Sequence, residues 1–237
     1  MQPQPITNYQ LPLLVSRLLI TVYCLLITVS CRSTSPTPTP TPIPTPSPTA
    51  EPSLTLLAFG DSLTEGLGVA AEDNYPAQLQ RKLQADGYSV AVINGGISGE
   101  TSSAALSRVE WMLGTHPDIV IVETGANDAL RGVDLVLTHA NIDSIVGQFS
   151  DSGAVVIVAG MQIIQNLGED YTSEFAAIYP DVAEKHGSIL IPFVLEGVAA
   201  DPALNQPDFI HPNAAGYTVM VDHIYPFVLD AIEQVQP

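Results

Sequence analysis

Three side chains that lie far apart in the sequence could together cleave an ester bond. The segment Gly60-Asp61-Ser62 follows directly on the apolar run 54–59, and Asp208 and His211 stand three residues apart near the C-terminus. A serine hydroxyl becomes a nucleophile when a neighbouring base removes its proton, and an imidazole can be that base. A carboxylate beside the imidazole holds the required tautomer and stabilises the imidazolium. These residue types therefore predict a serine esterase in which Ser62 attacks, His211 is the base and Asp208 orients it.

Attack on an acyl carbonyl also needs two or three fixed hydrogen-bond donors for the oxyanion that forms. The Gly-rich segment 94–99 and the segment 125–128 each follow an apolar run, as Ser62 does. We expect the donors to be the backbone N–H of Ser62, a backbone N–H of the Gly-rich segment and the side-chain amide of Asn127.

The elements that must position these residues alternate between strands and helices. Apolar, β-branched runs predict short buried strands at 54–59, 89–93, 119–123, 154–159 and 188–191. Helical spacing of apolar residues predicts helices at 75–85, 102–113, 135–149, 173–186 and 212–235. This alternation predicts a three-layer α/β/α, doubly wound domain with a five-stranded, mostly parallel sheet. Because sites in such sheets form at the carboxyl ends of the strands, we expect the three polar segments to converge at one edge.

Four segments of the chain resemble the conserved blocks of the SGNH, or GDSL-type, hydrolases. They are Phe59-Gly60-Asp61-Ser62-Leu63-Thr64, Asn94-Gly95-Gly96-Ile97-Ser98-Gly99-Glu100-Thr101, Gly125-Ala126-Asn127-Asp128 and Asp208-Phe209-Ile210-His211-Pro212-Asn213. The resemblance covers nearly the whole domain and implies the flavodoxin-like fold of that family. It also implies a catalytic triad of Ser62, Asp208 and His211, and an oxyanion hole formed by Ser62, Gly99 and Asn127.

Within the family, the chain is similar to the bacterial thioesterase I/protease I/lysophospholipase L1 (arylesterase) group. Segments 129–132, 161–162 and 177–180 support that placement, and Ala126 departs from it where the group often has a second glycine. The resemblance implies ester, thioester or lysophospholipid substrates. We expect Leu130, Met161 and Ile163 to contribute to the substrate pocket.

Two other functions are compatible with the same residues. The first is a carbohydrate O-acetyl esterase, and the second is a surface lipoprotein that binds a ligand on a non-catalytic scaffold. The remaining histidines have no evident carboxylate partner in the sequence, and we do not expect them to be catalytic. They are His116, His139, His186 and His223.

The N-terminal segment predicts export and attachment to a membrane. Residues 18–29 form an uncharged apolar run that is short for a bilayer span, which needs about 20 residues, but suits a signal peptide. Small residues before Cys31 resemble a bacterial lipobox, so we expect 1–31 to be a lipoprotein signal with Cys31 lipidated. An uncleaved membrane anchor and an ordinary secretion signal remain open. The Pro/Thr-rich stretch 32–53 predicts a disordered linker, and 54–237 the catalytic domain.

Composition limits the partners of the domain. Its net charge is −19, which disfavours nucleic acid, and both cysteines, Cys24 and Cys31, precede it. No His, Asp or Glu cluster has metal-ligand spacing, and we expect no metal and no cofactor. We expect a small ester as the partner, a monomeric catalytic domain, membrane contact only through the N-terminal lipid or anchor, and a periplasmic or cell-surface location.

Overall fold

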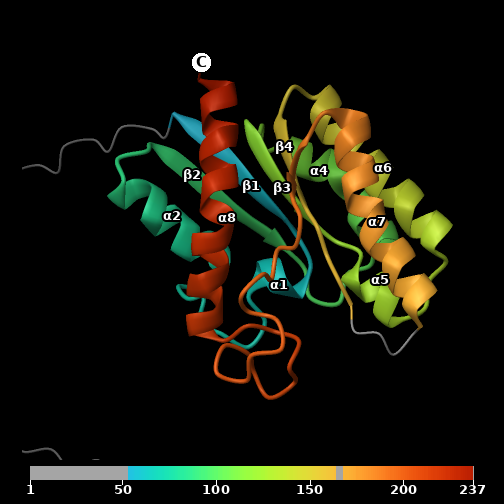
Figure 1. Ribbon diagram of the computed structural model, residues 1–237. Helices are drawn as coiled ribbons and strands as arrows, with labels where there is room; N and C mark the ends of the chain where they lie inside the picture. Colours follow the sequence, from blue (N-terminus) through green and yellow to red (C-terminus); the bar gives the residue numbers. More distant parts are fainter. Residues whose placement is uncertain (1–52, 164–167, 237) are drawn as a thin grey trace, which may run out of the picture. The chain divides into compact units, whose positions relative to one another are not determined.

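The computed structural model of this protein describes residues 53–163 and 168–236. The signal or anchor predicted for 1–31, including Cys31, and most of the predicted linker lie outside these residues. In the described part, five strands form one sheet with helices on both faces (Figure 1). The strands are β1 (Leu54–Gly60), β2 (Val90–Gly96), β3 (Ile119–Glu123), β4 (Val155–Ala159) and β5 (Ile189–Ile191).

Every strand pairing in the described sheet is parallel, in the order β2-β1-β3-β4-β5. The chain runs outward from β1 to β2 and then crosses back to β3, so the direction of winding reverses between β1 and β3. Ligands bind at such a reversal, outside the carboxyl ends of the strands. The predicted three-layer, doubly wound fold is therefore confirmed.

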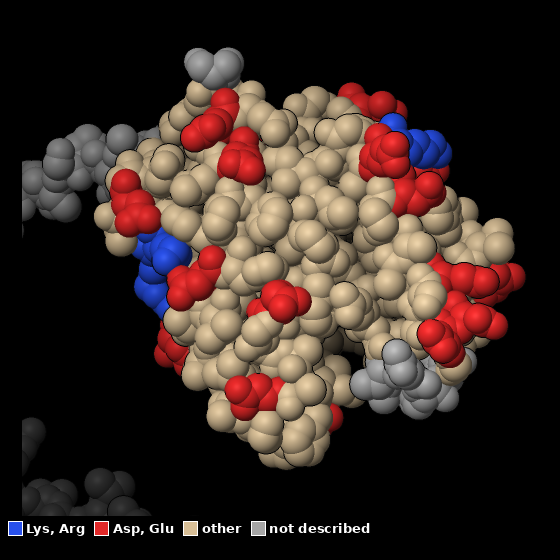
Figure 2. Space-filling model, in the orientation of Figure 1, with Lys and Arg blue, Asp and Glu red and all other residues tan. Residues whose placement is uncertain are grey.

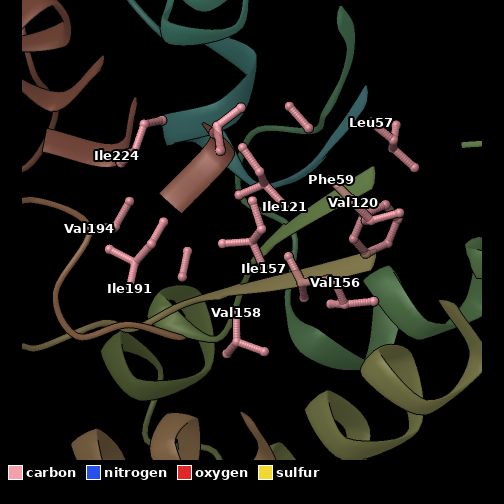
Figure 3. Close-up of a cluster of buried hydrophobic side chains, with 14 of the residues drawn as sticks. Leu57, Phe59, Val120, Ile121, Val156, Ile157, Val158, Ile191, Val194 and Ile224 are labelled. Atoms are coloured by element: carbon pink, nitrogen blue, oxygen red, sulfur yellow. The ribbon is translucent and has the colours of Figure 1, made fainter. Parts of the chain in front are cut away.

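The central strands are buried because nearly every side chain in them is apolar. β1, β3 and β4 contain one exposed or half-buried residue each at most, while the edge strands β2 and β5 are more open. A strand that is covered on both faces of the sheet has apolar residues at consecutive positions, as these strands do. Figure 3 shows side chains from β1, β3, β4 and β5 together with Ile224 in this core.

Helices form the two outer layers. α2 and α8 pack together on one face, and α3, α4, α6 and α7 cover the other (Figure 1). The helices are α1 (Ser62–Glu65), α2 (Tyr75–Ala85), α3 (Ser102–Ser107), α4 (Val109–Leu113), α5 (Ala126–Leu130), α6 (Leu135–Asp151), α7 (Glu169–His186) and α8 (Ala214–Val235). Among residues 53–163 and 168–236, no helix has the length and apolar character needed to cross a bilayer.

Several predicted boundaries are wrong, among them the start of α7, which is Glu169 rather than residue 173. The helix predicted at 102–113 is two helices, α3 and α4, because Arg108 has a non-helical backbone (φ −113°, ψ 5°). The strand predicted to end at residue 93 continues to Gly96, where it pairs with Gly60. The last helix begins at Ala214 rather than residue 212, because the Asn213 side chain caps it by accepting a hydrogen bond from the Gly216 N–H at 3.0 Å.

Candidate active site

Ser62 lies at the tight turn between β1 and the short helix α1. The preceding residue, Asp61, is the N-cap of α1, and its carboxylate accepts a hydrogen bond from the Leu63 N–H at 3.1 Å. This cap fixes the direction in which the chain leaves β1. The turn leaves Ser62 at the carboxyl edge of the sheet and 7% exposed.

The structure brings Ser62, His211 and Asp208 together in a hydrogen-bonded chain. His211 Nε2 lies 2.8 Å from Ser62 Oγ, and His211 Nδ1 lies 2.7 Å from Asp208 Oδ2. With Nδ1 protonated and donating to Asp208, Nε2 is free to accept the serine proton. Ser62 and His211 are 149 positions apart in the sequence, and the loop from β5 to α8 brings His211 to the serine.

Asp208 stays ionised because local hydrogen bonds favour its charged form. Burial raises its pKa, but donors to the carboxylate outweigh that effect and lower the pKa to about 2. Its Oδ1 accepts hydrogen bonds from the N–H groups of His211 at 3.0 Å and Ile210 at 2.9 Å, while Oδ2 faces the imidazole. The carboxylate can therefore stabilise an imidazolium at neutral pH.

The loop after β2 is held against the end of β1 and α1, and it ends at Gly99. Its backbone is fixed by a hydrogen bond from the Ile97 N–H to the Gly60 carbonyl at 3.0 Å and one from the Ser98 N–H to Glu65 Oε2 at 2.7 Å. Gly99 has a φ of +75°, which a residue with a side chain rarely adopts. The carbonyl of Gly99 accepts a hydrogen bond from Arg131 Nη2 at 2.8 Å, which links this loop to the end of α5.

Asn127 lies in the first turn of α5, on the loop after β3. Its Nδ2 donates to Asp61 Oδ2 at 2.9 Å, and this contact fixes which way the amide faces, because the amide oxygen would be repelled by the carboxylate. A side-chain amide has two N–H groups, so one stays available for a ligand. The positive φ of this turn falls on Gly125 (+104°), and Ala126 begins the helix, so alanine is tolerated there.

A buried ion pair ties the Gly99 loop to β1, the strand that precedes the serine. Arg108 donates to both carboxylate oxygens of Glu100, at 2.7 and 2.6 Å, and through Nη2 to the Gly60 carbonyl at 3.2 Å. Its guanidinium also lies 4.0 Å from the ring centroid of Phe59. Because Glu100 follows Gly99 directly, Arg108 links the Gly-rich loop, β1 and the break between α3 and α4.

A second acidic side chain, Glu123, is buried beneath Asp61. Burial raises the pKa of both carboxyl groups, and the nearby Asp61 charge raises that of Glu123 further. Glu123 Oε2 accepts hydrogen bonds from the Asp61 N–H at 3.2 Å and the Thr64 hydroxyl at 2.9 Å, while its Oε1 has no partner among the described residues. Asp61 has donors on both oxygens, so we assign the proton of this pair to Glu123 and the charge to Asp61.

Asp128, beside Asn127, holds the loop rather than facing the serine. It is fully buried and accepts hydrogen bonds from the Ser102 N–H at 2.7 Å and the Ser102 hydroxyl at 2.6 Å. This contact joins α5 to the start of α3.

The three residues that we expect to contribute to the substrate pocket differ in how far they are exposed. Leu130 is half exposed on α5, Ile163 is half-buried after β4, and Met161 is buried and belongs to the core. In Figure 2 the surface is hollowed between α5 and the loop that carries Asp208 and His211.

Two histidines that lack an evident partner in the sequence do pair with carboxylates. His139 lies 2.6 Å from Asp181, and His186 lies 2.8 Å from Asp143. Both pairs join α6 to α7, where residues distant in sequence meet. They are contacts between helices away from Ser62, and we assign them no catalytic part.

The sequence also matches a known family over most of its length. Residues 58–219 match the GDSL-like Lipase/Acylhydrolase family. The chain belongs to this family. The family resemblance read from the four sequence segments is thereby confirmed, and the protein is a hydrolase that acts on ester bonds.

Individual proteins are similar to more than two thirds of this chain. Esterase TesA of Pseudomonas aeruginosa is 35% identical over 173 residues, which are 73% of this chain and 86% of that protein. Thioesterase 1/protease 1/lysophospholipase L1 of Escherichia coli is 36% identical over 169 residues, or 71% and 80% of the two chains. The crystal structure of esterase EstA from Pseudoalteromonas sp., inhibited by monoethylphosphonate, has a TM-score of 0.70 at 30% identity and covers 76% of this chain and 97% of its own.

Several residues that shape the GDSL-like site were not found from the sequence. Arg108, Glu100 and Arg131 each act on the loop of Gly99, but a single arginine or glutamate in a helical or loop segment carries no local signal. Only the acidic residue directly after Gly99 and the arginine eight positions later could have suggested a pair.

Proposed function

We propose that this protein hydrolyses carboxylic esters through an acyl-enzyme on Ser62. The observation that carries the proposal is the chain of two hydrogen bonds from Ser62 Oγ to His211 and from His211 to Asp208, at 2.8 and 2.7 Å. Such a chain, at the switch point of the sheet and beside candidate oxyanion donors, is the arrangement that nucleophilic acyl transfer requires.

In the first half-reaction Ser62 Oγ attacks the carbonyl carbon while its proton passes to His211 Nε2. The carbonyl oxygen becomes an oxyanion that accepts hydrogen bonds from the backbone N–H of Ser62, the backbone N–H of Gly99 and the free N–H of Asn127 Nδ2. The tetrahedral intermediate then collapses. The bond to the leaving alcohol oxygen breaks, and that oxygen takes the proton from His211.

In the second half-reaction water replaces the alcohol. His211 takes a proton from the water as its oxygen attacks the acyl carbon, and the proton returns to Ser62 Oγ as the carboxylic acid leaves. Asp208 keeps its negative charge throughout and stabilises the imidazolium in both halves.

Among substrate classes, we infer that small or medium acyl esters, including thioesters and lysophospholipids, fit this site. The names of related proteins support this inference, because one is a thioesterase and lysophospholipase. Leu130 and Ile163, which are partly exposed, would line the acyl side of the pocket, whereas Met161 is buried in the core. We also propose that the protein is a membrane-tethered lipoprotein outside the cytoplasm, on the basis of Cys31 and the proline-rich stretch 32–53.

The test is a panel of p-nitrophenyl esters and acyl thioesters assayed with the wild-type protein and with Ser62→Ala. We expect turnover of at least one class by the wild type and a loss of roughly 10⁴-fold or more in kcat in the variant. Circular dichroism and the melting temperature show whether the variant keeps its fold. A folded Ser62→Ala variant with undiminished activity would exclude the proposed nucleophile.

A further inference from the structure

Large apolar side chains are exposed beside the candidate catalytic groups. Phe209 is 62% exposed and Ile210 48% exposed, and both stand directly before His211 in the chain. Leu67, just after α1, is 43% exposed. Single exposed apolar residues are common, but several around one site mark a surface that contacts an apolar ligand.

Hydrogen bonds within the loop hold Leu67 and Phe209 near the same residue, Gln206. Gln206 accepts a hydrogen bond from the Phe209 N–H at 2.9 Å through its carbonyl, and its Nε2 donates to the Leu67 carbonyl at 2.6 Å. The Leu67 N–H in turn donates to the Ser62 carbonyl at 3.0 Å. Leu67 and Phe209 are thus both anchored to Gln206, and both lie next to residues of the catalytic chain.

Phe209 occupies a backbone conformation that does not suit it. Its φ is +60°, in the left-handed region that residues with a Cβ atom seldom adopt. The surrounding hydrogen bonds impose this conformation. Asp208 Oδ1 accepts from the Ile210 and His211 N–H groups, and the Gln206 N–H donates to the His211 carbonyl at 2.8 Å.

Neither the backbone nor the core explains a phenylalanine at this position. Glycine would adopt the same φ without strain and would leave the Asp208–His211 geometry unchanged. A ring that is mostly exposed contributes little to the core. The remaining role for the ring is contact with something outside the folded chain, and the nearest such group is a substrate bound at Ser62.

We propose that Phe209 is a specificity-determining residue which, with Ile210 and Leu67, forms an apolar rim that receives a hydrocarbon part of the ester. This proposal rests on the proposed function, since it needs a substrate at Ser62. The hydrocarbon can belong to the acyl chain or to the alcohol, and the two are distinguished by experiment.

The test compares wild type and Phe209→Gly on two series of soluble, monomeric esters. One series contains methyl esters of acids of increasing length, and the other contains acetates of alcohols of increasing length. We expect kcat/KM of the wild type to rise with chain length in at least one series. In Phe209→Gly the loss should grow along that series, from within threefold on methyl acetate to roughly tenfold on the longest member, because the hydrocarbon loses its apolar contact.

Phe209→Gly should lower the activity on long esters without lowering the stability of the fold. Glycine relieves the left-handed strain, so the melting temperature of Phe209→Gly should equal or exceed that of the wild type.

His116→Gly is the matched control, because His116 is also exposed with a positive φ (+50°) but lies just before β3, at the opposite edge of the sheet. We expect it to leave the length dependence unchanged. Phe209→Leu should keep most of the length dependence.

Two outcomes would overturn the proposal. One is an unchanged length dependence in both series. The other is an equal loss on methyl acetate and on long esters, which would assign Phe209 to the positioning of His211. If Phe209→Gly does not fold, Phe209→Asn serves instead, because asparagine tolerates the left-handed region and removes the apolar ring. Absence of all ester turnover in the wild type would refute the proposed function itself and the rim with it.

Discussion

The carboxylate of Asp61 connects the candidate nucleophile to the candidate oxyanion donor. One of its oxygens accepts from the Leu63 N–H at the start of α1, and the other accepts from Asn127 Nδ2. A donor that is fixed before the reaction needs no reorganisation when charge develops, which is the main source of electrostatic catalysis. Asp61 therefore sets the position of two elements that are 66 residues apart.

Replacing Asn127 by alanine tests this arrangement at a single residue. We expect kcat to fall by roughly 10²–10³ because one oxyanion donor is lost, with a smaller effect on KM. Steady-state kinetics on a p-nitrophenyl ester measures the change, and the melting temperature controls for damage to the fold. A loss of less than about threefold would remove Asn127 from the role of oxyanion donor.

At the scale of the elements, the carboxyl ends of β1, β2 and β3 lie side by side at one edge of the sheet. Gly60 at the end of β1 pairs with Gly96 of β2 on one side and with Glu123 of β3 on the other. The loops that follow therefore start from the same edge. A Cβ atom on Gly96 would lie 2.0 Å from the Glu65 nitrogen, so glycine allows α1 to pack against the end of β2.

The Arg108–Glu100 pair should hold these loops in register as well as stabilise the fold. Arg108→Met alone should lower the free energy of unfolding by about 3–5 kcal/mol, because it leaves Glu100 buried without a partner. Adding Glu100→Leu should restore most of that loss. We expect a lowered kcat in the single variant and no recovery of kcat in the double variant, since both lack the hydrogen bond from Arg108 to the Gly60 carbonyl. Recovery of kcat together with stability would show that the pair only stabilises the fold, and denaturant melts with steady-state kinetics decide the matter.

Glu123 predicts a pH dependence of stability. Its pKa is raised in the folded state, so the folded protein binds a proton that the unfolded chain releases above about pH 4.5. Its contribution to stability is therefore complete below that pH and is lost as the pH rises toward the folded pKa. Glu123→Gln keeps an acceptor oxygen and removes the titration. We expect its stability to decline less steeply with pH, by at most about 1.4 kcal/mol per pH unit, in denaturant melts. An unchanged slope would mean that Glu123 is ionised in the folded state.

At the scale of the whole molecule, the charge is strongly negative. The chain has 7 basic and 25 acidic residues, and Figure 2 shows acidic side chains spread around this face with basic ones at only two places. Anionic esters should be repelled. Raising the ionic strength from about 0.02 to 0.5 M should raise kcat/KM for a carboxylate-bearing ester by roughly threefold or more, and should leave a neutral ester of the same size nearly unchanged. Equal effects on both esters would contradict electrostatic repulsion.

Much of this molecule could be predicted from its sequence because the central strands are uninterrupted apolar runs and the polar segments follow them directly. The strand and helix order and the doubly wound sheet follow from that pattern. The meeting of Ser62 with Asp208 and His211 is predicted instead by the chemistry of these residue types and by the family resemblance. The break at Arg108 and the strain at Phe209 could not be predicted, because each depends on contacts between segments that only the folded chain brings together.

The most direct test of the account is covalent labelling of the serine by a phosphonate ester. The activated Ser62 oxygen should attack phosphorus, and the adduct should then resemble the tetrahedral intermediate. We expect one adduct per folded chain, located on Ser62 by peptide mass spectrometry and absent from Ser62→Ala and from unfolded protein. A folded protein that forms no adduct, or that forms it on another residue, would contradict the assignment of Ser62 as the nucleophile.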